Sequence, residues 1–259
     1  MKNSNILKSF LFAVLVLPGV SMAEESPFSG NVSLTTDYLF RGISQTSAKP
    51  AIQGGFDYAN PNGLYAGIWG SSISWLGDGG VASGAGTELD TYVGFGGDLT
   101  EDFTYDVGFL RYNYPGYYVS GATKADTNEI YGAIGWKFIT LKYSNSMGDT
   151  FGIKDASGTS YVELNASYEI EDAGVTLGAH YGKQTYKGTP ADTLKAGGTD
   201  PTYSDYNLSA SKGFGGYDVA LTYSSTNAKK GGWYTLTQAD GSTTDLGEGT
   251  VVLSVSHAM

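Results

Sequence analysis

The chain has 259 residues, a formal net charge of −11 and no cysteine, with 38 glycines and 20 tyrosines. The lack of cysteine excludes disulfide scaffolds, thiolate zinc sites and cysteine nucleophiles, and the acidic balance argues against nucleic-acid binding, which needs clustered Lys and Arg. Abundant glycine and aromatic residues with only 16% charged residues suit a membrane β-barrel better than a soluble enzyme.

Residues 1–23 have the pattern of a secretory signal peptide. Two lysines precede an apolar stretch from Phe10 to Leu17, and small residues stand at the −3 and −1 positions of a cut after Ala23. The stretch is too short for a membrane anchor, which needs roughly 20 apolar residues. We expect removal of residues 1–23, leaving 24–259 as one domain. An exported chain without a helical span is periplasmic, extracellular or an outer-membrane barrel.

Alternation with a period of two residues predicts twelve strands. They are expected at 31–43, 51–58, 64–75, 87–97, 103–113, 127–137, 141–145, 160–170, 175–184, 204–212, 217–226 and 249–259. Every proline after residue 23 falls outside them, as a closed sheet requires. The seventh, 141–145, is short for a membrane strand of about 9–11 residues. The turn before it lacks Gly and Asn, so a barrel of ten strands stays open.

The expected connections alternate in length. Short ones at 59–63, 98–102, 138–140, 171–174 and 213–216 alternate with longer ones, of which 185–203 and 227–248 are the longest. Short periplasmic turns opposite long outer loops are typical of outer-membrane barrels, whereas the alternative, a soluble β-sandwich, needs no such alternation. Aromatic girdles are expected at both membrane interfaces: Tyr58, Tyr65, Phe95, Phe103, Tyr105, Trp136, Tyr168 and Tyr217 at one, and Trp75, Tyr112, Tyr114, Tyr181 and Tyr223 at the other.

If the apolar face of each strand contacts lipid, the other face lines the lumen. The expected lumen-lining residues are Asp37, Arg41, Asp57, Glu88, Asp90, Asp106, Glu129, Lys137, Lys142, Glu163, His180, Asp205 and Asp218. Nine acids outnumber three Lys and Arg residues in this set. Because an acidic, narrow passage concentrates cations, we predict weak cation selectivity.

Arg41 and His180 have the most specific interpretations in this set. Asp37 and Arg41 lie roughly 13 Å apart on one expected strand, too far for a direct ion pair. Arg41 therefore either narrows the passage or forms a cross-barrel ion pair, the interpretation that we favour. His180 could serve a Ser-His-Asn hydrolase only with a serine beside it, and the sequence has no Gly-x-Ser-x-Gly motif. We expect no enzyme activity, no catalytic residue, no metal site and no cofactor.

Three segments carry a family resemblance. The run GNVSLTTDYLFRGISQT at residues 30–46 resembles the N-terminal signature of the TorF family of porins, and residues 63–71 and 112–116 are similar to stretches of the same family. This largely uncharacterised family implies an outer-membrane barrel acting as a channel and no catalytic residues. The C-terminal residue departs from the aromatic one that usually ends such barrels and that the assembly machinery reads, because it is Met259.

The sequence as a whole predicts an all-β protein, a single antiparallel transmembrane barrel of about twelve strands. Its expected function is passive diffusion of small polar solutes across the outer membrane. The expected partners are outer-membrane lipid and lipopolysaccharide, the barrel assembly machinery and small solutes, with no nucleic acid. A non-conducting structural or surface-binding barrel and a soluble secreted β-protein are the alternatives.

Overall fold

Twelve antiparallel strands close into a barrel in the computed structural model, which describes residues 26–237 and 241–259. Around the wall the order is β1-β4-β5-β7-β8-β10-β11-β12-β13-β14-β15-β18, and β18 pairs back with β1. These wall strands are β1 (Phe28–Thr35), β4 (Ala51–Ala59), β5 (Leu64–Ser72), β7 (Thr87–Asp98), β8 (Phe103–Asn113), β10 (Thr127–Trp136), β11 (Ile139–Ser146), β12 (Ser160–Ile170), β13 (Val175–Thr185), β14 (Tyr203–Phe214), β15 (Tyr217–Thr226) and β18 (Thr250–Ala258). The predicted all-β barrel of twelve strands is confirmed. The predicted export segment, residues 1–23, lies outside the described residues.

Strand β11 resolves the choice between ten and twelve strands. It runs from Ile139 to Ser146 rather than 141–145 and pairs with β10 and β12 along its length. The turn before it contains only Lys137 and Phe138, and Lys137 has a positive φ of 53°. This left-handed position of a tight turn is usually occupied by Gly or Asn. Because a lysine occupies it here, the sequence did not indicate a turn at this place.

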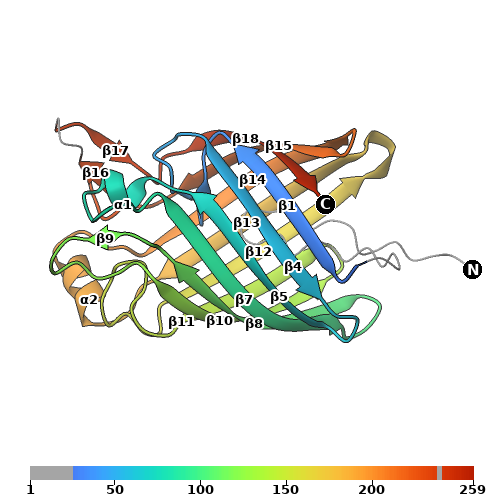
Figure 1. The fold of residues 1–259 in the computed structure, drawn as a ribbon, viewed down its shortest axis with the longest axis horizontal. Coiled ribbons are helices and arrows are strands. Elements are labelled where there is room, and N and C mark those ends of the chain that lie inside the picture. The colour runs from blue at the N-terminus through green and yellow to red at the C-terminus, as the bar shows by residue number, and fades with distance from the viewer. Residues whose placement is uncertain (1–25, 238–240) are drawn as a thin grey trace, which may run out of the picture.

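The two ends of the barrel differ, as Figure 1 shows. One end has tight turns and is called the short-turn end. The other, the long-loop end, carries two α-helices and the short strands of the connections. These are α1 (Trp75–Asp78), α2 (Thr189–Ala196), β2 (Leu39–Phe40), β3 (Ile43–Ser44), β6 (Ala82–Ser83), β9 (Tyr117–Tyr118), β16 (Thr235–Thr237) and β17 (Thr243–Asp245), while η1 (Glu171–Ala173) lies in a short turn. No helix among the described residues is long and apolar enough to cross a membrane.

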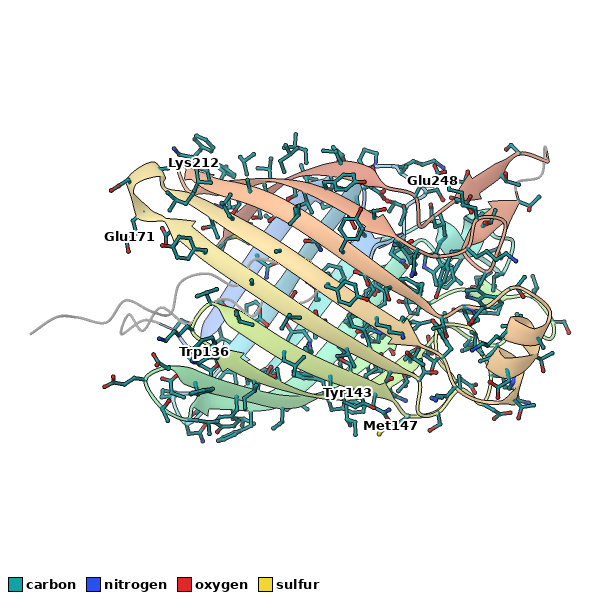
Figure 2. The ribbon with its side chains drawn as sticks, turned by 180° about the vertical axis from the view of Figure 1, so that it is seen from behind. Trp136, Tyr143, Met147, Glu171, Lys212 and Glu248 are labelled. Atoms are coloured by element: carbon teal, nitrogen blue, oxygen red, sulfur yellow. The ribbon has the colours of Figure 1, made fainter. Side chains whose placement is uncertain are left out.

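The outer face of the wall is apolar. Leu, Ile, Val and Phe side chains project from successive strands and stay exposed, for example Leu34, Ile52, Phe56, Ile68, Val107, Ile134, Leu164, Leu208, Leu221 and Leu253. Figure 2 shows Tyr143 projecting outward, with Trp136, Glu171 and Lys212 at the short-turn end and Glu248 at the long-loop end. A continuous apolar belt between two polar ends is the surface that a transmembrane barrel presents to lipid.

Tyrosine rings lie against glycines on the inner face of the wall. Tyr65 is directly opposite Gly94 on the neighbouring strand, and Tyr131 is directly opposite Gly108. A Cβ added at either glycine would collide with the tyrosine ring. The glycines therefore provide the space that lets large rings pack flat on the wall instead of blocking the lumen.

Four aromatic residues of the expected girdles point inward instead. Tyr65, Tyr112 and Tyr114 are buried in the core of the barrel, and Trp75 of α1 packs against that core. The girdle prediction is wrong for these residues because aromatic rings also fill the lumen. Period-two alternation separates the two faces of a strand but does not say which of them meets lipid.

Candidate functional site

The most unusual feature of the interior is a segment that crosses the lumen. Thr36 still donates its backbone N–H to Leu253 O on β18, after which the chain leaves the wall and folds inside the barrel, with β2 and β3 as a small hairpin. The segment returns through the exposed residues 48–50 to β4. We call residues 36–50 the strut. Most of its side chains are buried, among them Tyr38, Phe40 and Ile43. The predicted strand 31–43 is therefore wrong beyond residue 35, and Asp37 and Arg41 belong to the strut rather than to the wall.

The carboxylate of Asp37 holds the strut in shape. Its Oδ1 accepts hydrogen bonds from Ser44 Oγ at 2.6 Å and Thr46 Oγ1 at 2.9 Å, both on the returning arm of the hairpin. Thr46 Oγ1 also accepts from the Tyr38 backbone N–H at 3.1 Å. Short polar side chains that hydrogen-bond nearby groups stabilise compact loops, so the strut is an internally bonded unit.

Arg41 lies at the tip of the strut and joins it to the far wall. Its guanidinium makes two parallel bonds to Glu129, Nη1 to Oε1 at 3.1 Å and Nη2 to Oε2 at 2.8 Å. Nη1 also donates to Gln184 Oε1 at 2.8 Å. Both partners of the ion pair are buried, with side-chain exposure of 3% and 2%. Two-pronged Arg–carboxylate pairs are among the strongest polar contacts in proteins.

The contacts of Arg41 show that the strut spans the barrel. It departs from β1, whereas Glu129 lies on β10 and Gln184 on β13, about half-way around the ring of strands. The guanidinium also lies over the rings of Tyr161, at 4.2 Å, and Phe40, at 4.8 Å. The favoured interpretation, a cross-barrel ion pair, agrees with this placement, although the pair starts from an inserted loop rather than a wall strand.

A second attachment holds the base of the strut to α1. Ser47 Oγ donates to Asp78 Oδ2 at 2.7 Å, and Lys49 Nζ lies 3.8 Å from the same oxygen. Ser74 Oγ donates to that oxygen as well, at 2.6 Å. Partial burial alone would raise the pKa of Asp78, but these hydroxyls and the ammonium outweigh it and hold that pKa below its ordinary value.

Most of the predicted wall acids have hydrogen-bond partners inside the barrel. Asp57 accepts from the Tyr92 hydroxyl, and Asp106 accepts from Tyr65, whose hydroxyl also contacts Tyr131. Glu88 accepts from the Tyr114 hydroxyl at 3.1 Å. Asp90 is buried with no hydrogen bond to its Oδ1. Asp218 is half-buried near the short-turn end of β15.

A second polar cluster surrounds His180. Its Nε2 lies 2.9 Å from both Asp205 Oδ2 and the Tyr161 hydroxyl, and its Nδ1 lies 2.6 Å from Asn165 Oδ1. Glu163 Oε2 is 3.8 Å from Nδ1. Among the described residues no serine is hydrogen-bonded to the His180 ring, so a Ser-His nucleophile is not assembled there.

The structure separates the two predicted lumen lysines. Lys142 has its Nζ 4.2 Å from the centre of the Tyr131 ring, inside the barrel. Lys137 is an exposed turn residue at the short-turn end, where its Nζ lies 3.6 Å from Asp102 Oδ2. Lys137 is therefore not a lumen residue. The predicted strand 127–137 extended one position past the end of β10, and the turn carries that side chain outward.

The sequence analysis missed several residues of this interior, chiefly Gln184 and the tyrosines at 65, 92, 131 and 161. Tyr65, Tyr92 and Tyr131 are each paired directly across the strands with a glycine, and the ring of Tyr161 lies over Gly182, a diagonal neighbour. This signal becomes visible only when the strand register is known. Within the described part of the chain no three His, Asp or Glu side chains are arranged to hold a metal ion.

Two solved porin structures are similar to this chain. The chain resembles a KdgM porin in complex with disordered oligogalacturonate, with a TM-score of 0.50, 8% identity, and coverage of 89% of this chain and 96% of that one. It also matches Pseudomonas aeruginosa OprD at a TM-score of 0.40, 14% identity, and coverage of 92% and 68%. No curated protein matches the chain by sequence.

Because the identity is so low, the first of these similarities supports only the fold, a closed antiparallel β-barrel. The family is given by a match that covers nearly the whole sequence. A model described as a bacterial protein of unknown function, Gcw_chp, matches residues 21–259, across every wall strand and the strut. The chain therefore belongs to the Gcw_chp family.

Proposed function

We propose that this protein is an outer-membrane channel for passive diffusion of small polar solutes, with a weak preference for cations. The observation that carries the proposal is a closed transmembrane wall around a polar, acidic interior. A barrel serving only as a lipid-embedded scaffold gains nothing from buried carboxylates, since each one costs free energy to desolvate. Twelve strands also leave a lumen wider than that of the side-chain-filled eight-stranded barrels.

The charge balance of the interior supports cation preference. Asp57, Glu88, Asp90 and six further acids lie on the inner face of the wall or on the strut, where the lysine and arginine residues are Arg41, Lys142 and the exposed Lys49. Moving Lys137 to the exterior makes the interior more acidic than the sequence analysis expected. A field of this sign attracts cations and repels anions.

The strut makes the described conformation a closed one. It packs together with inward rings from β5, β7, β8 and β10 into one continuous core. Solutes then pass only when the strut moves, and the Arg41–Glu129 ion pair is the contact that must break first at its tip. Conductance should therefore be measured both with the strut present and with the strut replaced.

Single-channel recording in a planar bilayer under a KCl gradient tests the proposal. The wild type should give discrete steps with a cation-selective reversal potential. A variant in which residues 37–49 are replaced by a short Gly/Ser turn should give larger steps, because the wall strands do not need the strut for their hydrogen bonds. Anion-selective steps would contradict the charge argument. A folded barrel without steps in either protein would contradict the channel.

A second candidate is a non-conducting barrel with a structural or surface-binding role. The packed core around Tyr38, Tyr112 and Tyr114 favours it, because these rings fill the lumen beneath the loops. The strut-replacement variant separates the two candidates. Conduction only in the variant would favour a barrel that the strut keeps permanently closed.

We infer from the apolar surface and from residues 1–23 that the protein is exported and lies in the outer membrane. The apolar belt fits outer-membrane lipid, the loops above it fit contact with lipopolysaccharide, and the closing strand β18 is the segment that the barrel assembly machinery would read. Removal of residues 1–23 during export is testable by measuring the intact mass of the membrane-extracted protein. A mass that includes residues 1–23 would contradict export by cleavage.

A further inference from the structure

Asp90 stands apart from the other inward acids of the barrel. Its side chain is buried, with 2% of the residue exposed, and no hydrogen bond reaches its Oδ1. Asp57, Asp106, Glu129, Glu163 and Asp205 each have a hydrogen-bonding partner. An unpaired carboxylate in a closed interior is costly, so its charge must be either removed by a proton or balanced by a bound cation.

Glu88 adds a second incompletely paired group beside Asp90. The two residues are two apart on β7, so their side chains leave the same face of the strand. Tyr114 donates to Glu88 Oε1 and the Tyr38 side chain also interacts with this carboxyl group, whereas Glu88 Oε2 is buried without a hydrogen bond. Two orphan carboxylate oxygens therefore face the same part of the core, and Glu88 is completely buried.

Arg41, the buried cation of the strut, is not available to Asp90 and Glu88. Its guanidinium is used by Glu129 through two bonds and by Gln184 through a third, and ring faces cover it. Glu129, Glu88 and Asp90 thus share one positive charge among three carboxyl groups. The described side chains leave this region short of positive charge.

The neighbours of Asp90 are aromatic. Trp69 on β5 and Tyr112 on β8 are its direct cross-strand partners, and the edge of Trp69 packs against Tyr38 of the strut at 5.5 Å. Direct cross-strand neighbours have Cβ atoms about 4.5–5.5 Å apart. Aromatic faces attract cations through the quadrupole of the ring, so carboxylate and aromatic groups here favour the same kind of ligand.

We propose that Asp90 and Glu88 form a binding site for a monovalent cation, such as an alkali ion or a small ammonium ion, beneath the strut. The role of this site in permeation rests on the proposed channel. The binding itself does not, so it is tested without any measurement of conductance.

The test compares melting temperatures of the full-length folded barrel in detergent, in chloride salts of equal ionic strength. The probes are K⁺ and methylammonium, and the reference is N-methyl-D-glucamine, a much bulkier cation. At a cation concentration of ten times the Kd, we expect wild type to melt about 3–6 °C higher than in the reference salt. Equal ionic strength removes general screening as the cause.

Single-residue variants show which side chains cause the difference in melting temperature between the salts. Asp90→Asn should abolish the difference between salts and should melt above wild type in the reference salt, because it removes the uncompensated charge. Glu88→Gln, which keeps an acceptor for Tyr114, should reduce the difference. The matched control is Asp218→Asn on β15, which removes another inward carboxylate and should leave the wild-type difference intact.

Two results would overturn the site. One is a wild-type melting temperature that is the same in all the salts. The other is a salt difference that survives Asp90→Asn unchanged. Cation binding without conductance would support the binding site and contradict the proposed channel. The failure of one proposal can therefore be distinguished from the failure of the other. A response to only one probe identifies the class of cation.

Discussion

At the scale of single residues, the interior depends on side chains that satisfy one another across the barrel. Arg41 and Glu129 are 88 positions apart in sequence, and Tyr161 and Asp205 are 44 apart. Each pair is buried, so removing one partner leaves an uncompensated polar group rather than a solvated one. Substitutions at these positions should therefore act on the stability of the whole barrel.

Arg41→Ala should destabilise the folded barrel by about 3–5 kcal/mol, because Glu129 is left buried without its partner. The urea midpoint of the barrel in detergent micelles measures this. Arg41→Lys should recover only part of the loss, since an ammonium cannot bridge both Glu129 oxygens and Gln184. The double variant Arg41→Ala/Glu129→Gln should be more stable than Arg41→Ala alone, and equal stability of the two would contradict a coupled pair.

Gly108→Ala should destabilise the barrel by about 1–3 kcal/mol, because the added methyl group would collide with the Tyr131 ring. The control is Gly132→Ala on β10, where the added Cβ would meet only Val107, at 3.8 Å. The same urea titration applies to both variants. Equal effects at the two positions would show that the tyrosine does not need the space above Gly108.

At the scale of elements, the strut is the feature that distinguishes this barrel from an empty cylinder. Its shape comes from short-range hydrogen bonds around Asp37, and its position comes from Arg41 at the tip and Asp78 at the base. Both sets of hydrogen bonds have hydroxyl donors and a carboxylate acceptor, Asp78 at the base and Asp37 in the hairpin, so each of them depends on the ionisation of one carboxyl group.

Asp78→Asn should lower the melting temperature at pH 7 by an amount equivalent to at most about 1 kcal/mol. The pKa of Asp78 is depressed in the folded state, so its ionised form adds stability above the ordinary value of 3.8. That stability is lost as the pH falls through the lower folded-state pKa. Wild type and variant should therefore converge in paired melting curves as the pH falls well below 3.8. A difference that persists there would exclude the carboxylate as its source.

At the scale of the whole molecule, closure between the first and last strands completes the wall. β18 pairs with β1 from Asn31↔Ala258 to Thr35↔Ser254, and Gly30 and Met259 exchange two further backbone hydrogen bonds. The Met259 side chain itself is exposed, so its identity contributes little to the folded wall. Its effect should lie in assembly.

Met259→Phe should increase the fraction of protein that assembles into the membrane while leaving the melting temperature nearly unchanged. An aromatic terminal residue suits the recognition step, whereas the backbone bonds to Gly30 do not depend on the side chain. Heat-modifiable gel mobility of membrane fractions, compared at equal expression, measures the folded fraction. An unchanged folded fraction would show that methionine serves assembly as well as an aromatic residue.

The sequence by itself determined an antiparallel barrel of ten or twelve strands, most of the strand bounds and the face of each strand on which acids such as Glu129 and Asp205 lie. It could do so because hydrogen bonding in a barrel imposes a period of two and forbids proline in the wall. The pairing of β11 with both neighbours decided the count in favour of twelve. The ion pairing of Arg41 could be anticipated as a type of contact, since a charge inside a span needs a partner. Its partner could not be identified, because Glu129 is distant in sequence and no local pattern links the two.

Only the tertiary structure decided where the first strand ends. The alternation of Val32 and Leu34 continues through Tyr38 and Phe40, so the pattern extends past Thr35 although the chain turns into the lumen there. A buried ring in a packed interior and a ring in lipid have the same hydrophobicity. Which of the two surrounds a residue depends on contacts with other strands, and those contacts exist only once the barrel has closed.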